Sequence, residues 1–242
     1  MQEIHVEYSE DRGRRANAWV SHAVPFIAWL FIMQLLGDPA GWKYAVRTLV
    51  CLGLFLWLRP WVWYPRIQWR NLPLALAVGV GVCVAWVGFE SSWFQQAFPW
   101  FHDMYVRYGV LPWGELREPM TDPSPYDPLV CGWPLTLIRI AGSALVIGVI
   151  EEFFWRGFLY RWFARREWLD FDPPTFERTA FIMIAVVFAL EHVEWAGGLV
   201  AGLVYAWMYI RTGDLWSVAL AHAITNGLLG AYVVATASFQ FW

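Results

Sequence analysis

Two adjacent glutamates, followed four residues later by an arginine, are the residues whose types and spacing most directly suggest chemistry. Glu151, Glu152 and Arg156 interrupt a segment that is apolar over residues 141–150 and aromatic-rich over residues 153–160. A charged side chain at membrane depth costs about 3 kcal/mol or more, so such residues indicate a functional site with internal partners. On a helix Glu152 and Arg156 can pair, whereas Glu151 lies about 140° around the helix from Arg156. Glu151 is therefore the freer carboxylate.

Two further residue pairs later in the chain, each containing a histidine, have helical spacing. Phe188 and His192 are four residues apart, and so are His222 and Asn226, which places each pair on one helix face. In a low-dielectric cavity a carboxylate becomes a better base, and a neighbouring histidine can hold the same water. His222 and Asn226 could donate hydrogen bonds to the oxyanion of a tetrahedral intermediate, a role worth roughly 3 kcal/mol per donor. These groups predict hydrolysis.

Two other interpretations use the same residues. Glu151, His192 and His222 supply the two histidines and one carboxylate that a catalytic zinc ion accepts, which would make the protein a membrane metalloprotease, although no H-E-x-x-H motif is present. Alternatively, the polar groups only join helices through interhelical hydrogen bonds. In that case the protein would be a non-catalytic membrane scaffold or immunity factor.

The composition indicates a polytopic membrane protein. Of 242 residues, 59% are hydrophobic and only 15% are charged, which leaves too little polar surface to cover a soluble domain. The 19 Trp and 10 Tyr suit the two membrane interfaces, where amphipathic rings gather. A net charge of -3 gives no reason to expect a nucleic-acid partner. The three cysteines predict neither a disulfide framework nor a cysteine metal site.

The apolar segments and the polar motifs within them predict an all-α transmembrane helical bundle of about seven spans with a catalytic cavity inside the membrane. Residues 1–132 form N-terminal spans and a Pro-rich acidic loop, and residues 133–242 form the catalytic core. Glu90 falls within the third span, and the acidic extramembrane loop covers residues 98–132. The expected spans are 16–36, 44–64, 72–97, 133–166, 179–192, 196–210 and 215–237.

The fourth expected helix is longer than a bilayer. If helical throughout, residues 133–166 extend roughly 50 Å against a hydrocarbon core of about 30 Å, so the helix must tilt, break or project. Counting from the inner helix ends puts Glu151 and His192 about 21–22 Å deep and His222 about 10 Å deep. A tilted or late-starting last helix would bring all three to one cavity.

The distribution of arginines predicts the orientation. They concentrate before the first span, after the second and between the fourth and fifth, which the positive-inside rule assigns to the cytoplasm. The N-terminus is then cytoplasmic and the C-terminus lies outside. The expected location is the cell inner or plasma membrane.

The three motifs together resemble a known family. The series EEFFWR, FALEH and HAITN matches the EExxxR, FxxxH and HxxxN patterns of the CPBP family, which contains type II CAAX prenyl endopeptidases and bacterial Abi-type membrane proteins. The resemblance covers roughly residues 134–236. Within the family, the sequence is most similar to CAAX protease-related proteins associated with exosortase sorting systems, on the strength of EEFFWRGFLYRW, FALEH and the run from RTGDLW to AHAITNGLLG.

The resemblance implies a glutamate-dependent intramembrane endopeptidase that needs no cofactor. Carried over motif by motif, Glu151 would activate a water molecule with help from His192. Glu152 and Arg156 would support the site. Every position of the three motifs is occupied by the expected residue type, so the sequence does not point to an inactive relative.

The resemblance also implies the oxyanion site and the class of partner. His222 and Asn226 would stabilise the oxyanion. The substrate would be a membrane-anchored protein or peptide within the lipid bilayer, cut near its C-terminus. Cleavage would follow a prenylated cysteine or act on a C-terminal signal of a protein-sorting system.

Overall fold

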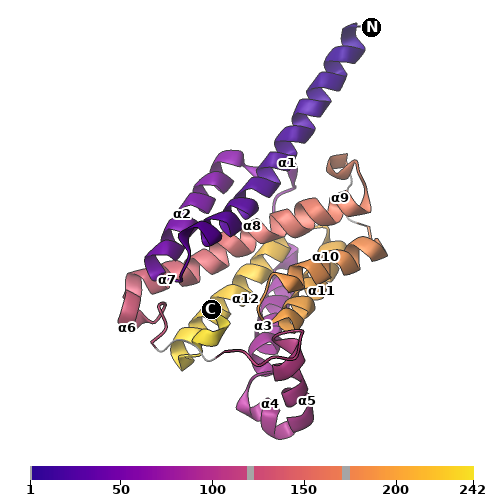
Figure 1. The fold of residues 1–242 in the computed structure, drawn as a ribbon. Helices are drawn as coiled ribbons and strands as arrows, with labels where there is room; N and C mark the ends of the chain where they lie inside the picture. The colour runs from indigo at the N-terminus through magenta and orange to yellow at the C-terminus, as the bar shows by residue number, and fades with distance from the viewer. Residues whose placement is uncertain (1, 119–122, 171–174) are drawn as a thin grey trace.

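The structure is a helical bundle (Figure 1), seen in a computed structural model that describes residues 2–118, 123–170 and 175–242. Over these residues it contains no strand, so the predicted all-α class is confirmed. The longer separate helices are α1 (Gln2–Leu36), α2 (Gly41–Leu58), α3 (Leu72–Gly88), α10 (Arg178–Leu190), α11 (Trp195–Thr212) and α12 (Leu215–Thr236). The short helices outside the long central helix are η1 (Pro60–Trp63), η2 (Trp69–Asn71), α4 (Ser92–Ala97), α5 (Pro99–Met104), η3 (Tyr105–Gly109), α6 (Pro128–Cys131), η6 (Trp168–Asp170) and η7 (Phe239–Phe241).

One long helix crosses the bundle and carries the two adjacent glutamates. It runs without interruption through α7 (Trp133–Ala141), η4 (Gly142–Ile147), α8 (Gly148–Glu152), η5 (Phe153–Tyr160) and α9 (Arg161–Ala164). The η4 and η5 segments are π-helical and flank α8 on both sides. Short π-helical turns are rare and frequently occur at functional sites. The predicted long helix is confirmed, and it ends at residue 164 rather than 166.

In the described part of the chain, four helical stretches are long and apolar enough to cross a membrane, by length and composition. They are Asn17–Leu36, Trp69–Gly88, Trp133–Ala164 and Leu215–Thr236. The other three expected spans correspond to α2, α10 and α11, which are shorter helices. The count of about seven spans therefore stays a prediction. In Figure 1 the first turns of α1 project away from the bundle.

The third expected span is wrong at its C-terminal end. Helix α3 ends at Gly88, and the chain turns there instead of continuing to residue 97. Ser91 starts helix α4 in a new direction, because its hydroxyl accepts a hydrogen bond from the backbone N–H of Phe94. Glu90 consequently lies in the turn, outside the membrane-spanning helix.

The segment between α3 and α7 is partly helical and is anchored to the α10–α11 turn. Arg117 donates to Glu90 at 2.9 Å and to Glu194 at 2.6 Å. The Trp195 indole N–H donates to the backbone carbonyl of Tyr108. These contacts join both sides of the bundle end that carries α4 and α5 (Figure 1). Residues 119–122 of the predicted acidic loop and residues 171–174 of the linker after α9 lie outside the described residues.

Helices α3 and α12 approach closely at a glycine. A Cβ atom added at Gly79 would lie 2.7 Å from the carbonyl oxygen of Ala221 and 2.7 Å from Cβ of Ile224. The hydroxyl of Thr225 donates to the Gly79 carbonyl at 2.9 Å. The absence of a side chain at residue 79 thus lets α12 pack at the depth where it carries His222.

We expect Gly79→Ala to destabilise the protein by about 1–3 kcal/mol, because α3 and α12 would have to separate. Gly81→Ala is the matched control, since no atom of the described residues lies within 4 Å of the corresponding Cβ position. In that exposed helical position the alanine should be neutral or stabilise by up to about 1 kcal/mol. Thermal unfolding of both variants in detergent measures the difference, and equal melting temperatures would contradict the close-packing argument.

Candidate active site

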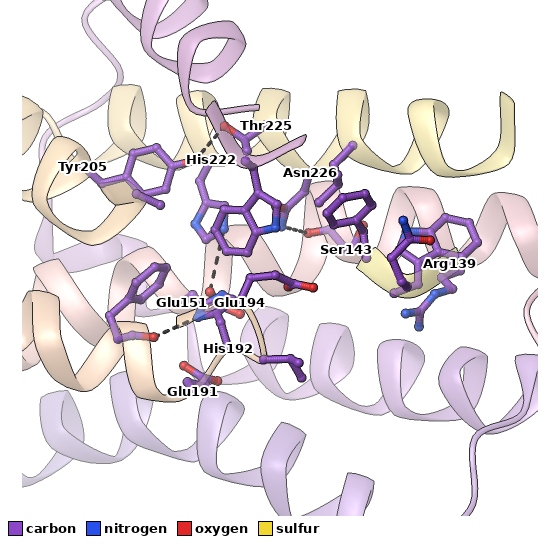
Figure 2. A pocket seen from close by; sticks show the side chains of 18 residues that line it. Arg139, Ser143, Glu151, Glu191, His192, Glu194, Tyr205, His222, Thr225 and Asn226 are labelled. Carbon is purple, nitrogen blue, oxygen red and sulfur yellow. Dashed lines mark hydrogen bonds and ion pairs between the residues drawn. The ribbon is translucent and has the colours of Figure 1, made fainter. Parts of the chain in front are cut away.

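A cavity of about 270 Å³ lies between α8, α11, α12 and the turn that joins α10 to α11 (Figure 2). Its polar lining includes Glu151, Glu191, His192, Tyr205, His222 and Asn226. Four of the six predicted site residues therefore face one cavity. The other two, Glu152 and Arg156, are completely buried behind it.

Glu152 is the polar centre of this buried layer. Its Oε1 atom accepts a hydrogen bond from Arg156 Nη1 at 2.9 Å, as the i,i+4 spacing predicts. The same Oε1 lies 2.9 Å from His222 Nδ1. Because an ionised carboxylate only accepts hydrogen bonds, His222 donates through Nδ1. Arg156 Nη2 also donates to the Gly202 carbonyl at 3.2 Å, which joins the pair to α11.

Glu151 presents a buried oxygen to the cavity. Its Oε2 atom lies 3.8 Å from His222 Nε2, and no described residue makes a hydrogen bond to it. Glu151, Glu152, Arg156 and a protonated His222 have formal charges that sum to zero. A proton can therefore rest on His222 or on Glu151 without changing the net charge of the buried group. Glu151 is thus well placed to accept a proton inside the cavity.

Aromatic rings fix the imidazole of His222. The ring of Tyr205 stacks on it with a centroid distance of 4.9 Å, and the Tyr205 hydroxyl donates to Thr225 Oγ1 at 2.7 Å. The Arg156 guanidinium lies 4.3 Å from the centroid of Phe188. Sequence reasoning assigned no role to Tyr205 or Thr225. A tyrosine in a chain that contains ten of them, or a threonine in an apolar helix, carries no distinguishing pattern.

His192 lies in the turn after α10, since the helix ends at Leu190 and not at residue 192 as predicted. The expected proximity to Phe188 is nevertheless present, because His192 Nδ1 donates to the Phe188 carbonyl at 2.8 Å. The imidazole also packs edge-on against Trp86 at 5.3 Å. Its Nε2 atom is left as the nitrogen available to accept a proton. Among the described residues, no hydrogen bond joins His192 to Glu151.

Asn226 is oriented by the π-helical segment η4. Its Nδ2 atom donates to the Ser143 carbonyl at 2.9 Å, a contact drawn in Figure 2. The same carbonyl accepts the backbone N–H of Gly148, five residues later. Because an amide nitrogen carries two hydrogens, Asn226 retains a second N–H.

Two more carboxylates lie at the edge of the cavity, on the turn between α10 and α11. Glu191 and Glu194 both line it, and Arg117 donates to Glu194. Burial raises the pKa of Glu194 to about 7, and Arg117 opposes this rise. Glu194 therefore connects the cavity to the segment between α3 and α7.

The zinc interpretation depends on Glu151, His192 and His222, which all line the cavity. Within the described ranges, no three His, Cys, Asp or Glu side chains are arranged so that they could hold a metal ion. His222 also directs Nδ1 to Glu152, so only Nε2 could bind a metal. Zinc dependence stays an untested alternative.

The chain was found to be similar to a known protein family. Residues 133–228 match the family model described as type II CAAX prenyl endopeptidase Rce1-like. No curated protein and no solved structure matches the chain. The family resemblance of the three motifs is thus confirmed over the helices that build the cavity. Together with the four long apolar helices, the match indicates an integral membrane protein with endopeptidase activity.

We expect Arg156→Ala to cost about 3–5 kcal/mol of stability, because it leaves the Glu152 carboxylate buried without its cation. The double variant Glu152→Gln with Arg156→Gln should recover part of this loss. Arg165→Ala is the control, since its pair with Glu167 is exposed at 3.9 Å and should contribute under about 1 kcal/mol. Denaturant unfolding measures all three, and a small effect of Arg156→Ala would contradict the argument that Glu152 needs this guanidinium as its buried partner.

Proposed function

Because residues 133–228 match the type II CAAX prenyl endopeptidase model and surround a buried carboxylate, we propose that the protein is a glutamate-dependent intramembrane endopeptidase that needs no metal. It hydrolyses a peptide bond near the C-terminus of a membrane-anchored protein. One observation supports this proposal most directly. Glu151 Oε2 faces the cavity beside His222, with no hydrogen-bond partner among the described residues.

In the first step, Glu151 accepts a proton from a water molecule, and the water oxygen forms a bond to the carbonyl carbon of the substrate. The electron pair of the C=O bond moves to the carbonyl oxygen. A protonated His222 donates through Nε2 and Asn226 through its second N–H, so both stabilise the resulting oxyanion. Each such donor is worth roughly 3 kcal/mol in the transition state.

In the second step, the tetrahedral intermediate collapses and the bond between carbon and nitrogen breaks. The proton held by Glu151 passes to the leaving nitrogen, directly or through Nε2 of His192. The products are a carboxylic acid and an amine, so one water molecule is consumed. Glu152 and Arg156 act as positioning residues, because they hold His222 in the orientation that directs Nε2 to Glu151.

We also propose where the protein is located and which class of substrate it cleaves. The arginine distribution supports a cytoplasmic N-terminus in the cell inner or plasma membrane. The substrate is a protein anchored in the lipid bilayer, either through a prenylated cysteine or through a C-terminal segment handled by a protein-sorting system. A panel that contains prenylated peptides and unprenylated membrane-spanning peptides separates these two classes.

We expect Glu151→Gln to lower cleavage by about 10²–10⁴-fold, because the amide cannot accept the proton from water. Glu191→Gln is the matched control, since Glu191 lines the same cavity without contacting His222 in any described hydrogen bond or ion pair. Its activity should fall only a few-fold. Mass spectrometry of the peptide panel after incubation with purified protein measures both, and melting temperatures verify folding. Full activity of Glu151→Gln would contradict the mechanism.

We also expect cleavage to survive treatment with a strong zinc chelator, because every proposed step uses side chains of this chain and water. Protein dialysed against chelator should retain its rate, and added zinc should not raise it. Loss of cleavage that zinc restores would identify a metalloprotease that uses Glu151, His192 and His222. Absence of cleavage from every peptide, in the presence or absence of zinc, would favour the non-catalytic scaffold.

A further inference from the structure

Arg139 is a buried cation at another part of the cavity that contains Glu151 (Figure 2). Only 9% of the surface of Arg139 is exposed, and its buried Nε atom has no hydrogen-bond partner among the residues that the structure describes. Three aromatic rings surround the guanidinium, with centroids at 3.8 Å for Tyr126, 4.5 Å for Tyr44 and 4.9 Å for Trp242. Over the described part of the chain, no carboxylate forms an ion pair with it.

This lack of an acidic partner distinguishes Arg139 from the paired arginines nearby. Arg156 is paired with Glu152, and Arg117 with two glutamates. Cation–π contacts offset only part of the cost of removing a guanidinium from water. Arginine keeps its charge under physiological conditions, and its planar fork of donors matches the two oxygens of a carboxylate. An anion is therefore expected beside Arg139 when the cavity is occupied.

We propose that Arg139, framed by Tyr44, Tyr126 and Trp242, binds the terminal carboxylate of the peptide substrate. This inference rests on the proposed endopeptidase function and specifies its substrate. Arg139 and Glu151 stand twelve positions apart on one helix, or about 18 Å. An extended peptide advances about 3.3 Å per residue. Allowing for side-chain reach, the free carboxylate must follow the cleaved bond by roughly three to six residues.

A lipid phosphate has similar bidentate chemistry, but the position of Arg139 favours the peptide. Arg139 lines the cavity together with Ser143, Glu151 and Asn226, and these residues surround the reacting groups. A peptide that reaches Glu151 with its cleaved bond would also bring its C-terminal end into this cavity. Arg139 thus sets both the chemical nature of the substrate end and its distance from the cleaved bond.

The test measures peptide binding to the full chain carrying Glu151→Gln, which blocks cleavage, in phosphatidylcholine nanodiscs. The probes are fluorescent peptides with an S-farnesyl cysteine followed by two to eight apolar residues, each ending in a carboxylate or in a carboxamide. For peptides with three to six residues after the cysteine, we expect the carboxylate form to bind at least about tenfold more tightly than the carboxamide form. A tenfold difference is what one charge-assisted hydrogen-bonded pair contributes. Adding Arg139→Gln should abolish this preference, and Arg139→Lys should retain part of it.

Arg47→Gln is the matched control. Arg47 is equally buried and lies over the rings of Trp29 and Tyr44, but it does not line this cavity. Its replacement should leave the carboxylate preference unchanged. Melting temperatures of both glutamine variants verify that each is folded, so a general loss of packing is distinguished from a loss of recognition.

Equal affinity for the two peptide ends, or an unchanged preference after Arg139→Gln, would overturn the proposal, as would absence of binding by every peptide. If Arg139→Gln instead alters only the retention of phosphatidylglycerol in mixed nanodiscs, the anion is a lipid phosphate and the peptide assignment is wrong. The readout is binding, whereas the proposed function is tested by cleavage with Glu151 intact. Failure of carboxylate recognition by Arg139 is therefore distinguishable from failure of the proposed endopeptidase function.

Discussion

The candidate site depends on one carboxylate oxygen, Oε1 of Glu152, which accepts hydrogen bonds from both Arg156 and His222. This shared contact joins the long central helix to α12, and the second bond of Arg156 to the Gly202 carbonyl adds α11. In a low-dielectric interior each of these charges is costly unless the others are in place. The long central helix, α11 and α12 are therefore held in one arrangement. Glu151 lies next to Glu152 on the central helix, and its Oε2 atom has no hydrogen-bond partner among the described residues.

The cavity is lined partly by the long central helix and partly by connecting segments. Glu151 and Arg139 lie on one uninterrupted helix, so the distance between the reacting group and the unpaired cation is set by helix geometry. The cavity lining also includes Glu194 on the α10–α11 turn, which is held by Arg117 from a distant segment. Glu151 and His222 thus lie on packed helices, whereas His192 and Glu194 belong to the turn between α10 and α11.

Local patterns made part of this arrangement predictable from sequence. The Glu152–Arg156 pair and the long central helix follow from spacing and apolar length, which neighbouring residues determine. The residue at which α3 ends could not be predicted from such local patterns, because Glu90 pairs with Arg117, a residue in a distant segment. The stacking of Tyr205 on His222 likewise exists only after α11 and α12 have packed. Contacts between segments far apart in the chain leave no periodic pattern.

The π-helical turn η4 has a consequence for the evolution of such chains. A π-helical turn accommodates one more residue than an α-helical turn, and the helix on either side continues in its original direction. A related gene could therefore lose one codon within residues 142–147, revert this turn to α-helix and still present the flanking residues on the same faces. Searches of genomes that require a fixed spacing between residues equivalent to Arg139 and Glu151 would overlook such relatives.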